Sequence, residues 1–375
     1  MGLLQDADTI PCKDWHTVEM RYPHIASWFK IRTRFPISFG LVYKLIQRHF
    51  YYEEENTSNY IQQEVSNLSL KGRNFIDLSD FERYELRKFL DTAHDLKRKQ
   101  KRGESHELLK GKSLAMIFMK SSTRTRVSFE VGMTQLGGHA LYLQPSGTQL
   151  GRGETIGDTA QVLSRYCDVI MARVFGHDEV AGLAEFGTVP VINGLSDLLH
   201  PCQIMADMMT IEEHKGKLEG LKITYVGDSN NVSNSIMQGC TIMGMDVTIG
   251  SPKGYTPSEE IMKKSTELSK RYKTTLEVVN DPKEAAKNAD VIYTDTFFSM
   301  GQERDEAKEA ALMAFQVNRS LVEAAKDDVI VMHCLPAHRD EELASDIMDD
   351  TRYSVVFDQA ENRLHAQKGI MALIV

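Results

Sequence analysis

Four hydroxyl side chains and two arginines lie close together in one short stretch of the sequence, SSTRTR at residues 121–126. The apolar run SLAMIF at 113–118 precedes it, and apolar residues follow it at i, i+3, i+4 and i+7 from Phe129 to Leu136. The first pattern predicts a buried strand and the second predicts one face of a helix. The helix therefore begins at the hydroxyls and arginines, where its free N–H groups and its positive dipole end favour an anion.

Arginines at this end of a helix need an explanation, because a cation there costs roughly 0.3–1 kcal/mol. Ser122 or Thr123 could simply cap the helix, but capping alone leaves Arg124 and Arg126 unexplained. An arginine presents a planar pair of donors that matches a phosphate group, and the hydroxyls add further donors. We therefore expect a phosphate site at residues 122–125.

Three further polar clusters follow strand-like runs. HPCQ at 200–203 offers an imidazole and an amide that could both reach a ligand carbonyl. DTFFSMG at 295–301 offers a carboxylate, a hydroxyl and a glycine turn, which suit an amino-acid head group, and HCLP at 333–336 places a thiol after the apolar run VIVM. Taken singly, a buried histidine, an ordinary turn and a small buried cysteine explain these clusters better. Their functional meaning depends on all of them occurring together.

The elements that must position these clusters alternate between helix-like and strand-like segments from residue 70 onward. The first cycle has strand-like runs at 113–118, 140–143, 168–172 and 189–192, and a second cycle begins at Leu221. Such alternation predicts an α/β fold. We expect two doubly wound parallel-sheet domains, linked by helices, with the carboxyl ends of their strands around a shared cleft.

Composition excludes several classes of protein. The 44 Lys+Arg against 53 Asp+Glu give a net charge of −9, which argues against a nucleic-acid binder. The five cysteines are widely spaced without a CxxC pair, which argues against a disulfide framework or a zinc site. No apolar run approaches the roughly 20 residues that a membrane-spanning helix needs.

Residues 1–69 differ from the rest and are expected to be an amino-terminal extension with a targeting segment and a linker. Residues 20–52 contain six basic residues and no acidic one, which is typical of a mitochondrial transit peptide. Four acidic residues in 1–19 do not fit an import signal unless Met20 is a second start site. We expect a location in the mitochondrial matrix; the alternative is an amphipathic arm on a cytoplasmic protein.

Together the motifs resemble the ornithine carbamoyltransferase family. The resemblance runs from about residue 70 to the end of the chain. STRTR and HPxQ indicate the wider carbamoyltransferase group, whereas the SMG loop with HCLP points to ornithine. The matching motifs are SSTRT at 121–125, ARV at 172–174, HPCQ at 200–203, NN at 230–231, DTFFSMG at 295–301, HCLP at 333–336 and ENR at 361–363.

The resemblance implies an enzyme that transfers the carbamoyl group of carbamoyl phosphate to the δ-amine of L-ornithine, giving L-citrulline and phosphate in arginine biosynthesis or the urea cycle. It implies a carbamoyl-phosphate-binding domain at 70–205, an ornithine-binding domain at 206–345, and a carboxy-terminal segment at 346–375 that returns to the first domain. It further implies a homotrimer with active sites at subunit interfaces, and neither a metal nor an organic cofactor.

The resemblance also implies the residues of the site. Arg173 and His200 polarise the carbonyl oxygen, Cys334 lies beside the attacking amine, and Arg363 steadies the tetrahedral intermediate; these four are the expected catalytic residues. Those expected to bind carbamoyl phosphate are Ser122, Thr123, Arg124, Thr125, Gln149 from a neighbouring subunit, Arg173, His200, Gln203, Cys334, Leu335 and Arg363. Those expected to bind ornithine are Asn231, Asp295, Ser299 and Met300.

Other functions fit the sequence less well. A nucleotide-binding dehydrogenase needs GxGxxG where this chain has GDSNN. An aspartate carbamoyltransferase needs basic groups for a second carboxylate in the loop that FFSMG occupies, and acetylornithine or putrescine enzymes do not need an intact SMG loop. A non-enzymatic scaffold or a membrane-surface protein is disfavoured because every expected catalytic position is filled.

Overall fold

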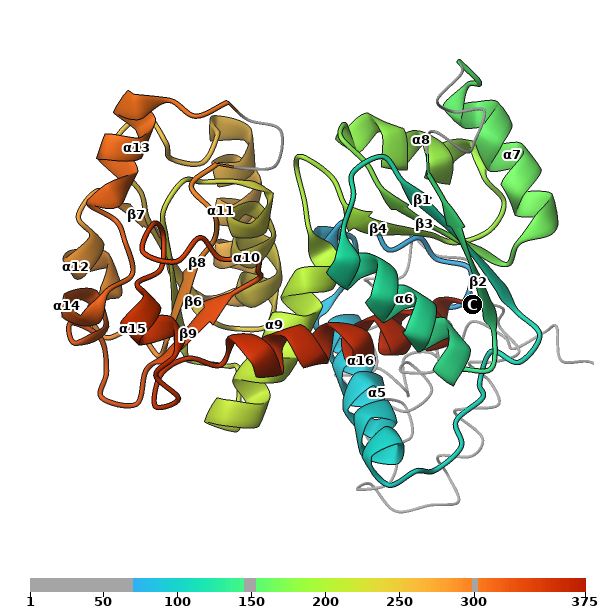
Figure 1. The fold of residues 1–375 in the computed structure, drawn as a ribbon, viewed down its shortest axis with the longest axis horizontal. Helices are drawn as coiled ribbons and strands as arrows, with labels where there is room; N and C mark the ends of the chain where they lie inside the picture. The colour runs from blue at the N-terminus through green and yellow to red at the C-terminus, as the bar shows by residue number, and fades with distance from the viewer. Residues whose placement is uncertain (1–69, 145–152, 299–302) are drawn as a thin grey trace, which may run out of the picture. The chain divides into compact units, whose positions relative to one another are not determined.

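The computed structural model describes residues 70–144, 153–298 and 303–375, and these form two parallel β-sheets with helices packed on them (Figure 1). The first lobe holds the order β2-β1-β3-β4, and the second lobe holds the order β7-β6-β5-β8-β9. Every pairing between these strands is parallel. The predicted α/β class with two parallel sheets is confirmed. The strands are β1 Ser113–Phe118, β2 His139–Leu143, β3 Val169–Arg173, β4 Val191–Leu195, β5 Lys222–Val226, β6 Asp246–Gly250, β7 Leu276–Val279, β8 Val291–Thr294 and β9 Ile330–His333.

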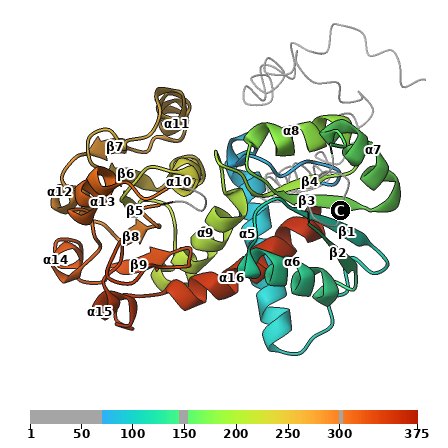
Figure 2. The same cartoon turned by 45° about the horizontal axis from the view of Figure 1, so that its top comes forward.

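Helices cover both faces of the first sheet. Figure 2 shows α7 and α8 on one face and α5, α6 and α16 on the other. The described helices are the short 3-10 helix η2 Leu78–Asp80, α5 Arg83–Lys101, α6 Thr123–Gln135, α7 Ile156–Tyr166, α8 His177–Phe186, α9 Pro201–Lys215, α10 Asn231–Ile242, α11 Glu259–Tyr272, α12 Pro282–Ala286, α13 Glu306–Met313, α14 Arg319–Val322, α15 Ser345–Met348 and α16 Val356–Ile374.

Alternation along β1 explains why its sequence is apolar throughout. Leu114, Met116 and Phe118 face the core that includes α5, α6 and α16, whereas Ala115 and Ile117 face the core under α7 and α8. Successive side chains of a strand point to opposite faces, so a strand covered on both sides is a continuous apolar run. Because β1 is buried in the sheet, its carboxyl end is fixed in position, and the SSTRTR cluster follows it directly in the chain.

In the second cycle the runs LKITYVGD, DVTIG, ADVIYTD and DDVIVMHCLP predict strands, but no strand was predicted at 276–279, where the structure has β7. It lies at the edge of the second sheet and its residues are only partly buried. An edge strand with one covered face does not need an apolar run, so LEVV carries little periodic signal. The buried strands that end at the polar clusters were all predicted.

Two helices join the lobes. The helix α9 packs against α10 of the second lobe and against α5 and β4 of the first, and α16 packs along α9, α5 and α6 (Figure 1). The Lys97 ammonium of α5 donates to Glu213 of α9 at 2.8 Å and to Asn362 of α16 at 2.7 Å. Helices from three distant parts of the chain are therefore held as one packed unit. The domain boundaries expected at residues 205 and 345 stay predictions.

We expect Gly369→Ala to lower stability because α16 crosses α5 closely at this position. A Cβ atom at Gly369 would lie 2.9 Å from the backbone oxygen of Phe89 and 3.0 Å from the backbone nitrogen of Ala93. Overpacking against backbone costs about 1–3 kcal/mol, which urea unfolding would measure. The control is Gly157→Ala in α7, where the added Cβ meets the Phe186 ring at 3.3 Å and the side chain can shift. Equal free energies of unfolding for the two variants would contradict the close crossing.

Candidate active site

The first turn of α6 is built as an anion-binding end of a helix. Ser122 caps the helix, accepting a hydrogen bond from the backbone N–H of Thr125 at 3.2 Å, and its own hydroxyl lies 3.1 Å from the Thr125 hydroxyl. The predicted start of the helix at the hydroxyl cluster is confirmed. The Thr125 side chain is fully buried, so this turn is held in place from beneath while its first N–H groups remain available to a ligand.

Three arginines converge beside this turn. Arg124 lies within it, Arg173 ends β3, and Arg363 projects from α16, where its Nη2 donates to the Thr125 hydroxyl at 2.7 Å. Arg173 is 6% exposed and Arg363 is 3% exposed. The Nε–H groups of all three are buried without an acceptor in the described part of the chain. These are donors held ready for a ligand.

Burial and the neighbouring arginines lower the pKa values of Arg173 and Arg363. Burial lowers the pKa of Arg173 to about 10, with further contributions from Arg363 and Arg124. Burial also lowers the pKa of Arg363, and Arg124 adds to the effect. Arg173 and Arg363 nevertheless remain cations at neutral pH. Among residues 70–144, 153–298 and 303–375 none of the three arginines forms an ion pair with a carboxylate, and a buried cation without one is costly. The geometry therefore favours an anionic ligand.

Neutral polar groups from α9 lie beside the cations. His200 is the residue before α9, and its backbone N–H donates to the Ser235 hydroxyl of α10 at 2.8 Å. Burial, followed by the charges of Arg363 and Arg173, lowers the pKa of His200 well below its ordinary value, so the imidazole is neutral at physiological pH. Its Nδ1 and the Oε1 of Gln203 are buried without a hydrogen-bond partner in the described residues. A neutral donor and a neutral acceptor suit an uncharged carbonyl or amide group of a ligand.

The second lobe contributes a thiol and a carboxylate. Cys334 follows β9, and its Sγ donates to Oδ1 of Asp295 at 3.1 Å, while Asn230 donates to Oδ2 of the same carboxylate at 2.8 Å. Burial and the neighbouring Asp295 charge raise the pKa of Cys334 well above its ordinary value. The group is a thiol at neutral pH and acts as a donor, which excludes a role as a thiolate nucleophile in this state.

The loop after β9 is held in an uncommon conformation. Leu335 has a φ of 60°, which places a residue with a side chain in the left-handed region. Its N–H donates to Nδ1 of His333 at 2.8 Å, and Nε2 of His333 donates to Glu342 at 3.0 Å. Such a conformation persists only where the surroundings hold it in place, and these two bonds do so.

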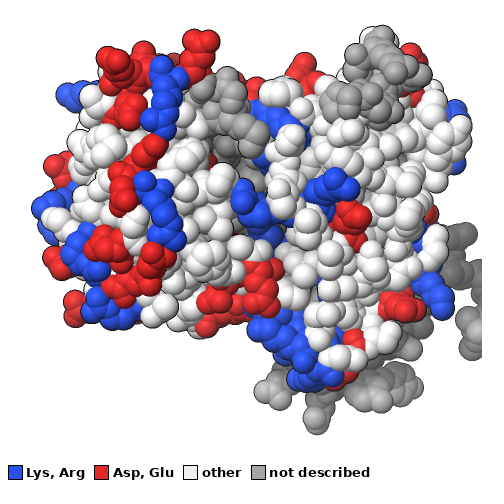
Figure 3. All heavy atoms as spheres, in the orientation of Figure 1, with Lys and Arg blue, Asp and Glu red and all other residues white. Residues whose placement is uncertain are grey.

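Residues of both lobes share one site. The pKa of Arg173 in the first lobe responds to Cys334 and Asp295 of the second, so these groups lie within electrostatic reach of one another. Asn231, at the start of α10, donates to the backbone oxygen of Ser196 in the first lobe at 2.6 Å. Figure 3 shows basic side chains in the hollow between the two lobes. The site is therefore a cleft at the carboxyl ends of the strands, where α/β proteins bind ligands.

Some of the expected site residues are not placed in this cluster. Gln149, Ser299 and Met300 lie outside the described residues. The Thr123 side chain is exposed and lines a groove on the outer face of α6 together with Val127 and Val131. Thr123 can therefore contribute its backbone N–H at the helix start, but its hydroxyl faces away from the buried cluster.

Sequence reasoning assigned no role to three residues that support the cluster. Asn230 holds the Asp295 carboxylate, Ser235 holds the backbone of His200, and Asp207 accepts a hydrogen bond from Gln203 at 2.8 Å. The spacing of Gln203 and Asp207 is i, i+4 on one helix, which places them on the same face and was readable in the sequence.

Asp295, His333 and Cys334 also have donor atoms within 4.8 Å of one another, close enough to be considered as metal ligands. Both His333 nitrogens are engaged, however, because Nδ1 accepts from Leu335 and Nε2 donates to Glu342. A metal ion would have to displace one of these bonds. The arrangement favours a structural role for His333.

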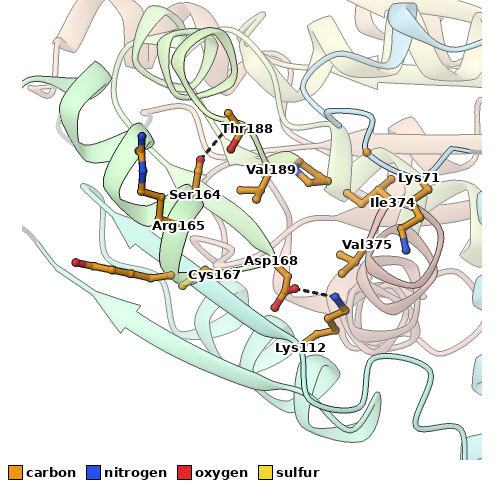
Figure 4. Close-up of a pocket in the computed structure, with 13 residues that line it drawn as sticks. Lys71, Lys112, Ser164, Arg165, Cys167, Asp168, Thr188, Val189, Ile374 and Val375 are labelled. Carbon is orange, nitrogen blue, oxygen red and sulfur yellow. Dashed lines mark hydrogen bonds and ion pairs between the residues drawn. The ribbon is translucent and has the colours of Figure 1, made fainter.

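A separate cavity of about 420 Å³ lies at the opposite edge of the first sheet (Figure 4). Lys112 and Asp168, which precede β1 and β3, line it and form an ion pair at 2.8 Å. The amino ends of the strands bound this cavity, so it is distinct from the cleft that holds Arg173. Lys112 and Asp168 already neutralise each other there, which makes the cleft the better candidate for an anion site.

Comparison with known proteins identifies the family. Residues 73–213 match the family model described as aspartate/ornithine carbamoyltransferase, carbamoyl-P binding domain, and residues 219–374 match the model described as aspartate/ornithine carbamoyltransferase, Asp/Orn binding domain. The chain belongs to the aspartate/ornithine carbamoyltransferase family. The resemblance of its motifs to this family is thereby confirmed.

Individual members of the family are similar over nearly their whole length. The chain is 55% identical over 309 residues to the ornithine carbamoyltransferase of Thermococcus kodakarensis, covering 82% of this chain and 98% of the relative. It is 54% identical over 309 residues to the anabolic ornithine carbamoyltransferase of Pyrococcus furiosus, with coverages of 82% and 98%. The solved structure of the Pyrococcus furiosus family member superposes with a TM-score of 0.80 at 54% identity, covering 82% of this chain and 98% of that one.

We expect Arg124→Ala to weaken the binding of inorganic phosphate at least tenfold. The variant removes a charge-assisted donor from a buried site, and such bonds contribute about 1.5–3 kcal/mol. Calorimetric titration with phosphate measures the change. The matched control is Arg126→Ala, which removes the same charge two residues later, where the guanidinium is exposed, pairs with Glu130 at 3.4 Å and lies over the Tyr142 ring. An equal loss of affinity in both variants would show that only net charge matters and would refute a specific site.

Proposed function

We propose that this chain transfers the carbamoyl group of carbamoyl phosphate to the δ-amine of L-ornithine, giving L-citrulline and phosphate. The observation that carries the proposal is the group of buried arginine donors without ion pairs, placed beside a neutral histidine and a neutral amide. Such a site suits a ligand that is anionic at one end and an uncharged amide at the other. The family members named above, which are ornithine carbamoyltransferases, direct the proposal to ornithine.

Carbamoyl phosphate binds first in this proposal, with its phosphate at the start of α6. The backbone N–H groups of Ser122, Thr123, Arg124 and Thr125 hold the phosphate oxygens, together with the side chains of Ser122, Arg124 and Thr125. The carbonyl oxygen receives hydrogen bonds from Arg173, His200 and Thr125. Gln203 accepts a hydrogen bond from the amino group. The remaining contacts come from Gln149 of a neighbouring subunit and from Cys334, Leu335 and Arg363.

Ornithine then occupies the side of the cleft formed by the second lobe. Its α-ammonium group lies near Asp295 and Ser299, and its α-carboxylate lies near Asn231 and the backbone of Met300. The Asp295 carboxylate is already oriented, because Asn230 and Cys334 each donate to one of its oxygens. This arrangement leaves the uncharged δ-amine directed toward the carbamoyl carbon beside Cys334.

Catalysis in this proposal depends on position and fixed charge. The amine attacks the carbamoyl carbon, the carbonyl oxygen takes up negative charge, and phosphate leaves when the tetrahedral intermediate collapses. Arg173, His200 and Arg363 stabilise the charge on that oxygen and on the leaving group. Preorganised donors that exclude water typically supply the largest share of such catalysis, and holding the two substrates together supplies much of the rest. The proposed chemistry requires no metal ion and no organic cofactor.

We place the carbamoyl-phosphate-binding domain at 70–205, the ornithine-binding domain at 206–345, and the returning segment at 346–375. The two family models meet between residues 213 and 219, at the end of α9. The packing of α16 against α5 and α6 supports the return of the last segment to the first lobe. Limited proteolysis that cuts first between residues 213 and 219, at the exposed end of α9, would move the boundary to that point.

We further propose a homotrimer whose neighbouring subunits complete each site. The outer face of α6 supports this proposal, because Val127 is 52% exposed, Val131 is 39% exposed, and both line a groove beside the phosphate-binding turn. These two side chains lie one helical turn apart and line the same groove, and contiguous exposed apolar surface of this kind marks interaction sites. Light scattering on the purified protein, giving three times the mass of one chain, would support the trimer, and a monomeric active enzyme would refute it.

The anabolic relative supports arginine biosynthesis as the pathway and gives no support to the urea cycle. Import into mitochondria through residues 20–52 stays a prediction, because these residues lie outside both the described residues and the family models. The two relatives named above give mitochondrial import no support and are consistent with the cytoplasmic alternative. No helix in the described part of the chain is long and apolar enough to cross a membrane. A fluorescent reporter fused to residues 1–52 and another fused to residues 20–52 would separate import from a cytoplasmic location.

We expect the protein to carbamoylate ornithine far more efficiently than putrescine or aspartate. Putrescine lacks the α-carboxylate and α-ammonium groups, so it leaves buried polar partners such as Asp295 unpaired, and a site of this kind discriminates by about 10⁴ or more. Parallel measurements of kcat/KM with the three amines test the expectation. An equal kcat/KM with putrescine or aspartate would refute the specificity for ornithine and would support only carbamoyl transfer in general.

We expect kcat/KM for ornithine to rise from neutral to alkaline pH in both the unmodified protein and Cys334→Ser. The attacking amine must be uncharged, and an amine with a pKa near about 10.4 is mostly protonated at pH 7. The Cys334 pKa is raised well above its ordinary value, so the thiol stays protonated throughout this rise and its titration does not shape it. Loss of the alkaline rise in Cys334→Ser would assign the rise to the thiol instead.

A further inference from the structure

A chain of hydrogen bonds connects the loops that carry Gln203 and Cys334. The backbone N–H of His333 donates to Oε1 of Gln359 at 2.9 Å, and Nε2 of Gln359 donates to Oδ1 of Asp207 at 2.8 Å. From the other side, Nε2 of Gln203 donates to the same Oδ1 at 2.8 Å. All four side chains are fully buried, so each of these bonds is protected from water.

The direction of this chain follows from its first member. A backbone N–H can only donate, so Gln359 must present its oxygen to His333 and its amino group to Asp207. Asp207 accepts at Oδ1, and burial raises its pKa to about 7. With Asp207 ionised, Oδ1 can only accept a hydrogen bond, from Gln203 as well as from Gln359. Gln203 must therefore present its amino group to Asp207.

The consequence for the cleft is an acceptor placed beside donors. With its amino group engaged, Gln203 has Oε1 left for other partners, and this buried oxygen has none among the described residues. Its charged neighbours, Arg173 and Arg363, are donors only. If the Gln203 amide were reversed, its amino group would join those donors, and the described part of the carbamoyl site would lack this acceptor.

We propose that Asp207 is a positioning residue that fixes the orientation of the Gln203 amide, so that Oε1 of Gln203 accepts a hydrogen bond from the amino group of carbamoyl phosphate. The inference rests on the proposed function and adds a source of specificity to it. Asp207 acts through Gln203, and together they distinguish the amino group of carbamoyl phosphate from a methyl group at the same position. Acetyl phosphate carries that methyl group and is otherwise closely similar in shape.

The test compares the dissociation constants of carbamoyl phosphate and acetyl phosphate, measured by calorimetry on the full chain. In Asp207→Leu the amide loses its anchor, and we expect the preference for carbamoyl phosphate over acetyl phosphate to fall by about tenfold, the value of one buried hydrogen bond. Asp207→Asn keeps an oxygen that can accept from both amides, so its preference should stay within about twofold of the unmodified protein.

Two further variants separate positioning from a purely structural role. Thr210→Val removes a different buried polar group of α9. The Thr210 hydroxyl accepts a hydrogen bond from Asn362 at 2.9 Å and forms none with Gln203. It can lower stability, but we expect it to leave the ligand preference unchanged. Gln203→Leu should lose the preference as Asp207→Leu does, and the double variant should lose no more than either one. Additive losses, or an unchanged preference in folded Asp207→Leu, would overturn the proposal.

A neutron diffraction map of the unmodified, deuterated protein decides the question without any variant, and therefore also if Asp207→Leu does not fold. Deuterium atoms of the Gln203 amide on the side of Asp207 would support the proposal, and deuterium atoms on the side of the cleft would overturn it. Failure of the proposed function is distinguishable, because the unmodified protein would then bind neither carbamoyl phosphate nor acetyl phosphate while the map still reports the amide orientation.

Discussion

Repulsion between clustered guanidinium groups is the constraint that the rest of this structure has to satisfy. Arg124, Arg173 and Arg363 come from a helix start, a strand end and the middle of a late helix, and none has a carboxylate partner among the described residues. Bringing them together costs free energy that a domain of ordinary marginal stability has to recover elsewhere. The recovery comes from packing: α16 is anchored along α5, α6 and α9, and its Arg363 is tied to the Thr125 hydroxyl. A bound phosphate group would supply the negative charge that no carboxylate of the described residues provides beside these arginines.

The helices α9 and α16 do more than fill space between the lobes. Both carry polar side chains that are fully buried and that bond across the helices, including the contact of Asn362 with Thr210 at 2.9 Å and the contact of Gln359 with Asp207 at 2.8 Å. Buried polar contacts of this kind contribute little net stability but penalise every alternative packing in which one partner is lost. They fix the register of α16 on α9. This register determines where Arg363 lies and which way the Gln203 amide points.

Local patterns in the sequence predicted the parts of the structure that local physics determines. The strand at 113–118 is buried on both faces and is therefore apolar throughout, and the start of α6 follows from the capping hydroxyl of Ser122. The contact between Arg363 and Thr125 joins residues 238 positions apart, and it depends on how the last helix packs against the first lobe. No local periodicity encodes such a pairing; Arg363 was found through the ENR motif of the family instead. Asp207 was missed although its spacing from Gln203 was readable, because its second partner, Gln359, lies 152 residues away.

The protonation states in the described part of the cleft restrict what the protein can contribute to the proposed reaction. His200 is held neutral by burial and by the neighbouring arginines, so its affinity for a proton is low. Cys334 is held as a protonated thiol, so it cannot act as a base. Neither His200 nor Cys334 is therefore suited to take the proton that leaves the attacking amine, and in the proposed arrangement this proton passes to the phosphate group or to water. The described side chains then serve mainly as fixed charges and oriented dipoles. Such groups need no reorganisation as charge develops in the transition state, which is the condition under which buried donors contribute most to a rate.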